Sequence, residues 1–171
     1  MKKHLFLGLE KTLIDSIEKQ QLLQSEVLKV KNFIKHHQIK EFGIFSFAID
    51  TVLEMINLLK SRLLAVLQTE LESECKSIQY TDKLRRNALI CTGCNLDLFV
   101  LKSIWGKERA FIEFAEREEE NGLWILIDDV VKTKLVTSLS NNGGTKHILV
   151  INIKDISSAW VVNTLNRIQE N

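Results

Sequence analysis

Short apolar runs alternate with longer amphipathic stretches along the whole chain. Five of these runs predict strands, at His4–Leu7, Phe42–Ala48, Leu96–Leu101, Leu123–Ile127 and His147–Ile153. The runs are nearly continuous in apolar character instead of alternating with polar residues. We therefore expect a sheet that is covered on both faces, as parallel sheets are.

Between these runs, apolar residues recur three or four positions apart, which predicts amphipathic helices. The predicted helices span residues 16–37, 51–74 and 107–120, and a last one begins at Asp155 or Ser157. Asp50 or Thr51 is expected to cap the second helix, and Gly122 to end the third. Because the chain has no proline, we expect these helices to run without internal breaks.

The alternation of strand and helix predicts one three-layer, Rossmann-like α/β domain over residues 1–171. Its sheet should have five mostly parallel strands, with helices on both faces and no large cap. Residues 76–95 are polar and basic and fit neither pattern, so we expect at most a small cap or a dimerisation element within residues 62–95. The strongly apolar helix predicted over residues 51–74 suggests a homodimer contact.

Charge and composition narrow the classes of partner. The 171 residues include 23 basic and 22 acidic side chains, a net charge of +1, so we expect no nucleic-acid partner. No apolar run reaches the length of a signal-peptide core or a membrane span, and no membrane association is expected. The three cysteines are an odd number and favour a reducing compartment, which indicates a cytoplasmic protein.

Candidate chemistry lies where the predicted strands end. In open parallel sheets, ligands bind outside the carboxyl ends of the strands, near the point where the strand order reverses. Eight residues are expected at this edge of the sheet: Gly8, Glu10, Thr12, Ser46, Asp50, Lys107, Asp128 and Asp129.

The order of these residues resembles the haloacid dehalogenase-like (HAD) phosphohydrolase superfamily. The first motif of that family is an apolar strand followed by Asp-x-Asp-x-Thr-Leu, and the same register here reads Gly8-Leu9-Glu10-Lys11-Thr12-Leu13. The next motifs are a strand ending in Ser or Thr, a Lys that opens a helix, and a strand ending in two acids. Ser46, Lys107 and the pair Asp128-Asp129 match them in order.

The resemblance implies a HAD fold and a phosphohydrolase site with two altered positions. In the family, the first aspartate attacks phosphorus and helps to bind magnesium, and Gly8 has no side chain for either role. The second aspartate is the general acid and base; Glu10 keeps a carboxylate on a longer side chain. By the same resemblance, Thr12, Ser46 and Lys107 would bind phosphate. Asp128 and Asp129 would hold Mg²⁺ weakly, if any cofactor is bound at all.

Three functions remain open at this point. The favoured one is a non-catalytic HAD-like protein that binds a phosphorylated ligand or a protein partner. The second is a magnesium-dependent phosphatase with altered chemistry, in which Glu10 and Asp128 are catalytic. The third is an unrelated α/β protein-interaction domain, in which Ser46 and Lys107 are ordinary surface or strand-end residues.

The spacing Cys91-x-x-Cys94 occurs once. A structural zinc site has four ligands, and no second pair of cysteines or histidines follows at a matching spacing. We therefore expect neither zinc nor redox chemistry there, and interpret the two residues as loop thiols.

Overall fold

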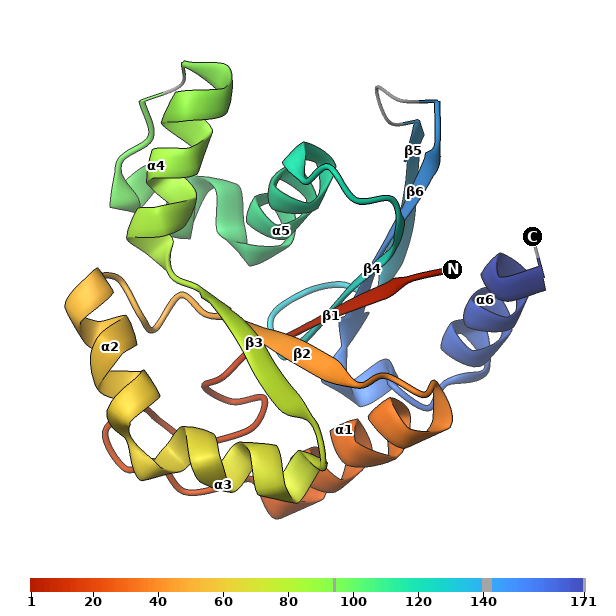
Figure 1. Ribbon diagram of the computed structural model, residues 1–171, viewed down its shortest axis with the longest axis horizontal. Helices are drawn as coiled ribbons and strands as arrows, with labels where there is room; N and C mark the ends of the chain where they lie inside the picture. The colour runs from red at the N-terminus through yellow and green to blue at the C-terminus, as the bar shows by residue number, and fades with distance from the viewer. Residues whose placement is uncertain (94, 140–142, 171) are drawn as a thin grey trace.

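The computed structural model describes residues 1–93, 95–139 and 143–170, and their chain path is shown in Figure 1. Within these residues a six-stranded sheet has the order β3-β2-β1-β4-β6-β5. The strands are β1 (Lys3–Leu7), β2 (Glu41–Phe45), β3 (Glu74–Gln79), β4 (Gly122–Asp128), β5 (Lys134–Leu139) and β6 (Thr145–Asn152). The protein thus has an α/β, Rossmann-like architecture.

The strands from β3 to β6 pair in parallel, and only β5 runs antiparallel, as a hairpin partner of β6. From β1 the chain proceeds to β2 on one side, whereas from β4 it proceeds to β6 on the other. The strand order therefore reverses between β1 and β4. In sheets of this kind a crevice opens at such a point, beyond the carboxyl ends of the strands.

Helices cover both faces of this sheet (Figure 1). They are α1 (Gln24–His36), α2 (Val52–Lys60), α3 (Arg62–Leu71), α4 (Thr81–Thr92), the π-helix η1 (Val100–Trp105), α5 (Gly106–Arg117), the short 3-10 helix η2 (Ile153–Asp155) and α6 (Ala159–Glu170). Residues of α1, α3 and α6 share one hydrophobic core with the sheet, and residues of α4 and α5 share the other. No helix in the described part of the chain is long and apolar enough to cross a membrane.

The two cores explain why the strands lack polar alternation. Successive side chains of a strand point to opposite faces. Leu5 and Leu7 of β1 accordingly belong to the core under α1, α3 and α6, while Phe6 between them belongs to the core under α4 and α5. Phe6 packs edge-on against Phe111 and Phe114 of α5, with ring centroids 5.7 and 5.3 Å away.

The prediction of five strands was wrong, and the errors lie at the edges of the sheet. The third predicted strand, Leu96–Leu101, is not a strand: the chain turns helical there and enters η1. The strand in this part of the fold is β3, which has the sequence ECKSIQ and few apolar residues. The edge strand β5 was also missed, because KLVTSL exposes much of its length.

The helix boundaries also differ from those predicted. Residues 11–22 form turns and isolated bridges, so the first helix begins at Gln24 and not at Ser16. The helix expected over residues 51–74 is two helices, because Ser61 adopts an extended conformation and donates its hydroxyl to the Leu58 carbonyl at 2.7 Å. The break therefore needs no proline. Thr51 caps α2 as expected, accepting the amide hydrogen of Glu54.

The third predicted helix ends earlier, at Arg117, and Gly122 does not cap it but opens β4 with a φ of +110°. A buried lysine closes this helix end instead. Lys146 of β6 is 2% exposed, and its ammonium donates to the carbonyls of Ala115 at 2.7 Å and of Glu118. Burial lowers the pKa of Lys146. A cation at a helix C-terminus satisfies carbonyls that have no partner within the helix.

Replacing Lys146 by Met should lower the free energy of unfolding by about 2–3 kcal/mol. Met keeps an apolar stem but leaves buried carbonyls without a charged donor, and hydrogen bonds to charged groups contribute about that much. Urea unfolding would measure the loss. The same change at the exposed Lys154 is the control and should alter stability by under about 0.5 kcal/mol. Equal effects at the two positions would contradict the assigned role.

Candidate functional site

The adjacent carboxyl ends of β1 and β4 bring Gly8 next to Asp128. Leu7 pairs with Ile127 in the parallel ladder, and the Gly8 amide donates to the Ile127 carbonyl at 2.9 Å. Gly8 and Asp128 thus lie next to each other at the ends of the two strands. The sequence predicted Gly8 as a degenerate nucleophile position and Asp128 as catalytic only if the protein is an active phosphatase.

The absence of a side chain at Gly8 is required by its neighbours. A Cβ built on Gly8 would lie 1.8 Å from Asp128 Oδ1 and 3.0 Å from Thr12 Oγ1. A heavy-atom contact of 1.8 Å is far inside van der Waals separation. The Asp128 carboxylate therefore occupies the space into which any side chain at position 8 would project.

Asp128 is held in that space by Lys107. The Lys107 ammonium lies 2.6 Å from Asp128 Oδ1, and the two side chains are 8% and 0% exposed. The other carboxylate oxygen, Oδ2, accepts the Val130 amide hydrogen at 3.1 Å. Lys107 is the second residue of α5, whose Phe111 and Phe114 anchor the helix on the sheet. The arrangement is a buried, hydrogen-bonded ion pair between helix start and strand end.

Thr12 reaches the same cluster from the loop after β1. The amides of Leu13 and Ile14 both donate to the Leu9 carbonyl, which folds this loop back over the strand end. The Thr12 hydroxyl, fully buried, lies 3.4 Å from Asp128 Oδ1 and 3.3 Å from Asp129 Oδ1. Burial, and next the charge of Asp128, raise the pKa of the Asp129 carboxyl. Four of the predicted residues, Thr12, Lys107, Asp128 and Asp129, are thus in contact.

Glu10 and Ser46 make other contacts. Glu10 Oε2 accepts the Ile17 amide hydrogen at 2.8 Å, which ties the carboxylate to the loop that follows. Ser46, 1% exposed at the end of β2, accepts the Ala48 amide hydrogen through its hydroxyl at 3.1 Å. Each of these side chains accepts a hydrogen bond from a nearby backbone amide, as polar side chains in turns commonly do.

A second ion pair at this edge was missed by sequence reasoning. Asp50, which follows β2, accepts the Thr81 hydroxyl at 2.6 Å and the Lys102 ammonium at 3.0 Å. Burial raises the pKa of Asp50, but the bonds from Thr81 and Lys102 outweigh it and hold the pKa below its ordinary value. Lys102 lies in η1, directly after a segment taken for a strand, so its position was not foreseeable.

The acids do not fit a resident magnesium ion. Asp128 and Asp129 are adjacent carboxylates of the kind Mg²⁺ selects, but both oxygens of Asp128 and one of Asp129 already accept protein hydrogen bonds. The cation at this place is the Lys107 ammonium. Among residues 1–93, 95–139 and 143–170, no three His, Cys, Asp or Glu side chains gather as metal ligands.

Of the two cysteines in the C-x-x-C sequence, Cys91 is exposed near the end of α4. Cys94 lies outside the described residues. The third cysteine, Cys75 of β3, is partly buried, and burial raises its pKa to about 11. A thiol with such a pKa stays protonated and unreactive at neutral pH.

Comparison with known proteins gives no relative: no protein-family model, no curated protein and no solved structure matches this chain.

Gly8→Ala should lower the free energy of unfolding by about 3 kcal/mol or more. The new methyl group forces the Asp128 carboxylate away from Lys107, and breaking a buried ion pair costs about 3–5 kcal/mol. Chemical denaturation would measure the loss.

The matched background is the double variant Lys107→Met with Asp128→Ala, in which there is no carboxylate to displace. There Gly8→Ala should cost less than about 1 kcal/mol, and the difference is the coupling energy. An equal cost in both backgrounds would show that Gly8 is not constrained by Asp128.

Proposed function

We propose that this protein is a degenerate HAD-like domain that does not catalyse phosphoryl transfer and acts by binding another protein. The observation that carries the proposal is the Asp128 carboxylate in the space beside Gly8, where a nucleophile would project. On this proposal, the residues of the former site now contact one another and have a structural role in the domain.

The resemblance to the HAD superfamily draws support from the arrangement at the ends of β1 and β4. Lys107, Asp128, Asp129 and Thr12 come from three separate segments and meet at the point where strand order reverses. A phosphohydrolase needs such a convergence, since its groups act on one phosphate. Gly8 stands in the same cluster.

The ion pair argues against both catalysis and phosphate binding. A nucleophile is needed to attack phosphorus, and Gly8 has none. A phosphate-binding lysine must offer its charge to the ligand, whereas the Lys107 charge is neutralised at 2.6 Å by Asp128 and is only 8% exposed. Of the two ligands that the sequence left open, a protein is therefore the better supported.

The wild type should hydrolyse no p-nitrophenyl phosphate above the buffer rate in the presence of Mg²⁺. Inorganic phosphate at millimolar concentration should leave the amide NMR signals of Gly8, Ser46 and Lys107 unchanged, because each of their side chains or backbones is already engaged. Turnover that Asp128→Asn abolishes would refute the non-catalytic proposal. Phosphate-dependent shifts at these amides would refute the proposal that this site does not bind phosphate.

Restoring the family residues is a sharper probe. Gly8→Asp with Glu10→Asp should still give no turnover and should lower stability, because an Asp at position 8 meets the Asp128 carboxylate. The matched control is Glu10→Asp alone, which leaves position 8 free. Turnover gained in the double variant would show that Asp128 moves aside and that the rest of the site still binds phosphate.

Support for a protein partner comes from α2. Four of its apolar side chains lie in the solvent, with exposures between 36% and 64%: Val52, Leu53, Ile56 and Leu59. Their spacing puts them along one side of the helix. In an antiparallel pairing of two α2 helices about a two-fold axis, the first turn of each, which carries Glu54, would meet the last turn of the other, which carries Lys60. A second copy of this chain is the partner we propose.

Sedimentation equilibrium tests that partner. The wild type should show a monomer–dimer equilibrium, and Leu53→Glu with Leu59→Glu should shift the dissociation constant by at least about tenfold, because buried like charges oppose the contact. The control is Leu28→Glu, an equally exposed apolar position on α1. A wild type that stays monomeric at all concentrations would refute self-association.

A further inference from the structure

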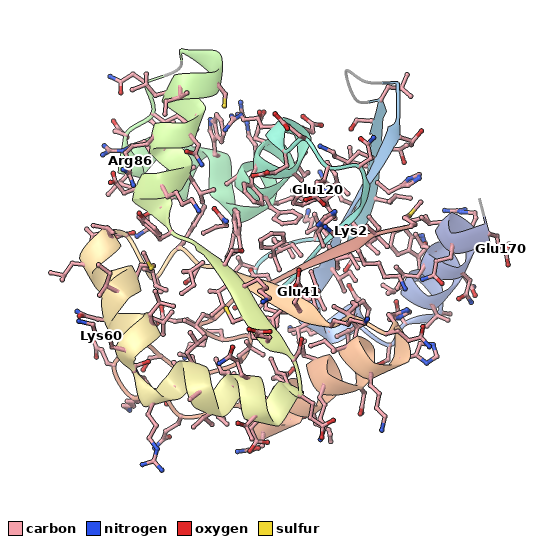
Figure 2. All side chains as sticks on the ribbon, viewed as in Figure 1. Lys2, Glu41, Lys60, Arg86, Glu120 and Glu170 are labelled. Carbon is pink, nitrogen blue, oxygen red and sulfur yellow. The ribbon has the colours of Figure 1, made fainter. Side chains whose placement is uncertain are left out.

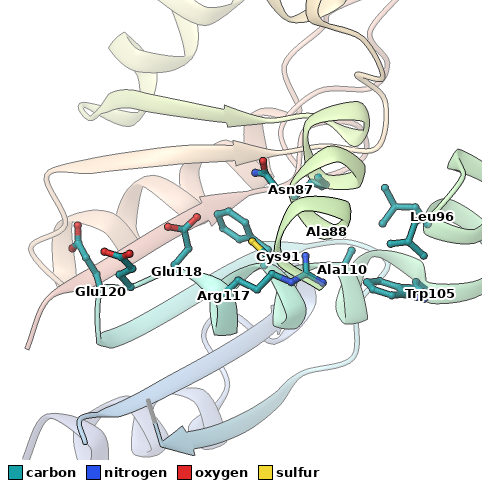
Figure 3. Close-up of a pocket in the computed structure, with 13 residues that line it drawn as sticks. Asn87, Ala88, Cys91, Leu96, Trp105, Ala110, Arg117, Glu118 and Glu120 are labelled. Atoms are coloured by element: carbon teal, nitrogen blue, oxygen red, sulfur yellow. The ribbon is translucent and has the colours of Figure 1, made fainter. Parts of the chain in front are cut away.

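A pocket of about 380 Å³ lies between α4, η1 and α5, and Lys107 is not among the residues that line it. Figure 3 shows it as a space between the α4 and α5 ribbons. One part of its wall is apolar and includes Leu84, Leu101, Trp105 and Phe114. Its size lies within the range of small-molecule sites, which are mostly apolar with a few polar groups.

The basic side chain that lines this pocket is Arg117, the last residue of α5. Its side chain is 20% exposed and extends between the two helices on the side of Cys91 and Ala110 (Figure 3). The guanidinium makes one long contact, 3.4 Å, to Glu113. Its Nε–H is buried and has no acceptor among the described residues.

A buried donor without an acceptor is costly, and native structures seldom retain one. Two neighbouring N–H groups of a guanidinium present a planar fork that fits a carboxylate. An incoming carboxylate would give Nε the acceptor it lacks and would place the rest of the ligand against the apolar wall.

Acidic residues at the mouth of the pocket do not reverse this preference. Glu118, Glu119 and Glu120 are exposed to solvent, which screens their charges. Glu120 is also paired with Lys2 at 2.6 Å, and Figure 2 labels the two residues side by side at the start of β1. Arg117 is therefore the charge that a ligand within the pocket meets.

We propose that this pocket binds a monocarboxylate with an apolar body, such as a medium-chain fatty acid or an arylalkanoate, and that Arg117 pairs with its carboxylate. This binding is independent of the proposed protein-binding function, since no residue of the pocket belongs to the Lys107–Asp128 cluster or to α2.

Three probes of matched length test the proposal on the full chain: octanoate, octylamine and octanol. NMR titration should show octanoate binding with shifts at Leu84, Ala110 and Arg117. Octanol and octylamine should bind at least about tenfold more weakly, because a hydrogen bond to a charged group is lost. Equal or tighter binding of octanol or octylamine, or no octanoate binding at millimolar concentration, would overturn the proposal.

Variants locate the site. Arg117→Met should weaken octanoate binding at least about tenfold and leave octanol binding unchanged, whereas Arg167→Met on the opposite face of the sheet should change neither. Ala110→Leu fills the pocket and should block octanoate while keeping Arg117. An octanoate affinity unaffected by both Arg117→Met and Ala110→Leu would overturn the assignment.

Cys91, which lines the pocket, provides a readout that needs no change of the wall. In a Cys94→Ser background, octanoate should slow the alkylation of Cys91 several-fold. It should not change the alkylation rate of a free reference thiol added to the same mixture. An unchanged rate at saturating octanoate would place the ligand elsewhere.

Discussion

The buried ion pair between Lys107 and Asp128 constrains the surrounding edge of the sheet more than any other single contact. It joins the start of α5 to the end of β4, and its carboxylate fills the space over Gly8 at the end of β1. With both charges out of water, neither partner can be lost alone without leaving an uncompensated charge. Gly8 therefore stays without a side chain, and the buried Thr12 hydroxyl contacts the carboxylates of Asp128 and Asp129.

Stability alone does not explain why two charged residues, Lys107 and Asp128, are buried at this position. Apolar residues of similar volume would pack at this place as well or better, since desolvating two ions offsets much of their attraction. A threonine, a lysine and two acids at the reversal point of an α/β sheet are, however, the kinds of polar side chain that ligand sites of such sheets contain. The proposed function accounts for the pair as the remainder of such a site, in which Asp128 pairs with Lys107.

How far the sequence predicts this fold depends on burial. The central strands β1, β2, β4 and β6 are covered on both faces, so their apolar runs stand out. The edge strands β3 and β5 carry a weaker signal, because ECKSIQ and KLVTSL bury only part of their length. LDLFVL looks like a strand by composition, yet Phe99 is 68% exposed and Leu101 is buried. Tertiary packing overrides local preference there.

For the candidate site, the sequence predicts where the residues lie but not which hydrogen bonds they make. Strand ends share one edge of a parallel sheet, which places Gly8, Thr12 and the acidic pair together, and Lys107 joins them from the start of the helix that leads into β4. Which hydrogen bonds Glu10 and Ser46 make depends on loop conformation, and no periodicity encodes it. The cluster of Asp50, Thr81 and Lys102 required β3 and η1 to be assigned correctly, so one error in the strands concealed it.

The three buried or half-buried cations around α5 differ in what they leave for a ligand. Lys107 gives its charge to Asp128, and Lys146 gives its donors to the carbonyls that close the helix. Both ammonium groups are therefore engaged in contacts within the protein. Arg117 makes one long contact and keeps a buried N–H without an acceptor. A small anion would therefore find a free donor at Arg117, at the end of α5, and not beside Lys107 at its start.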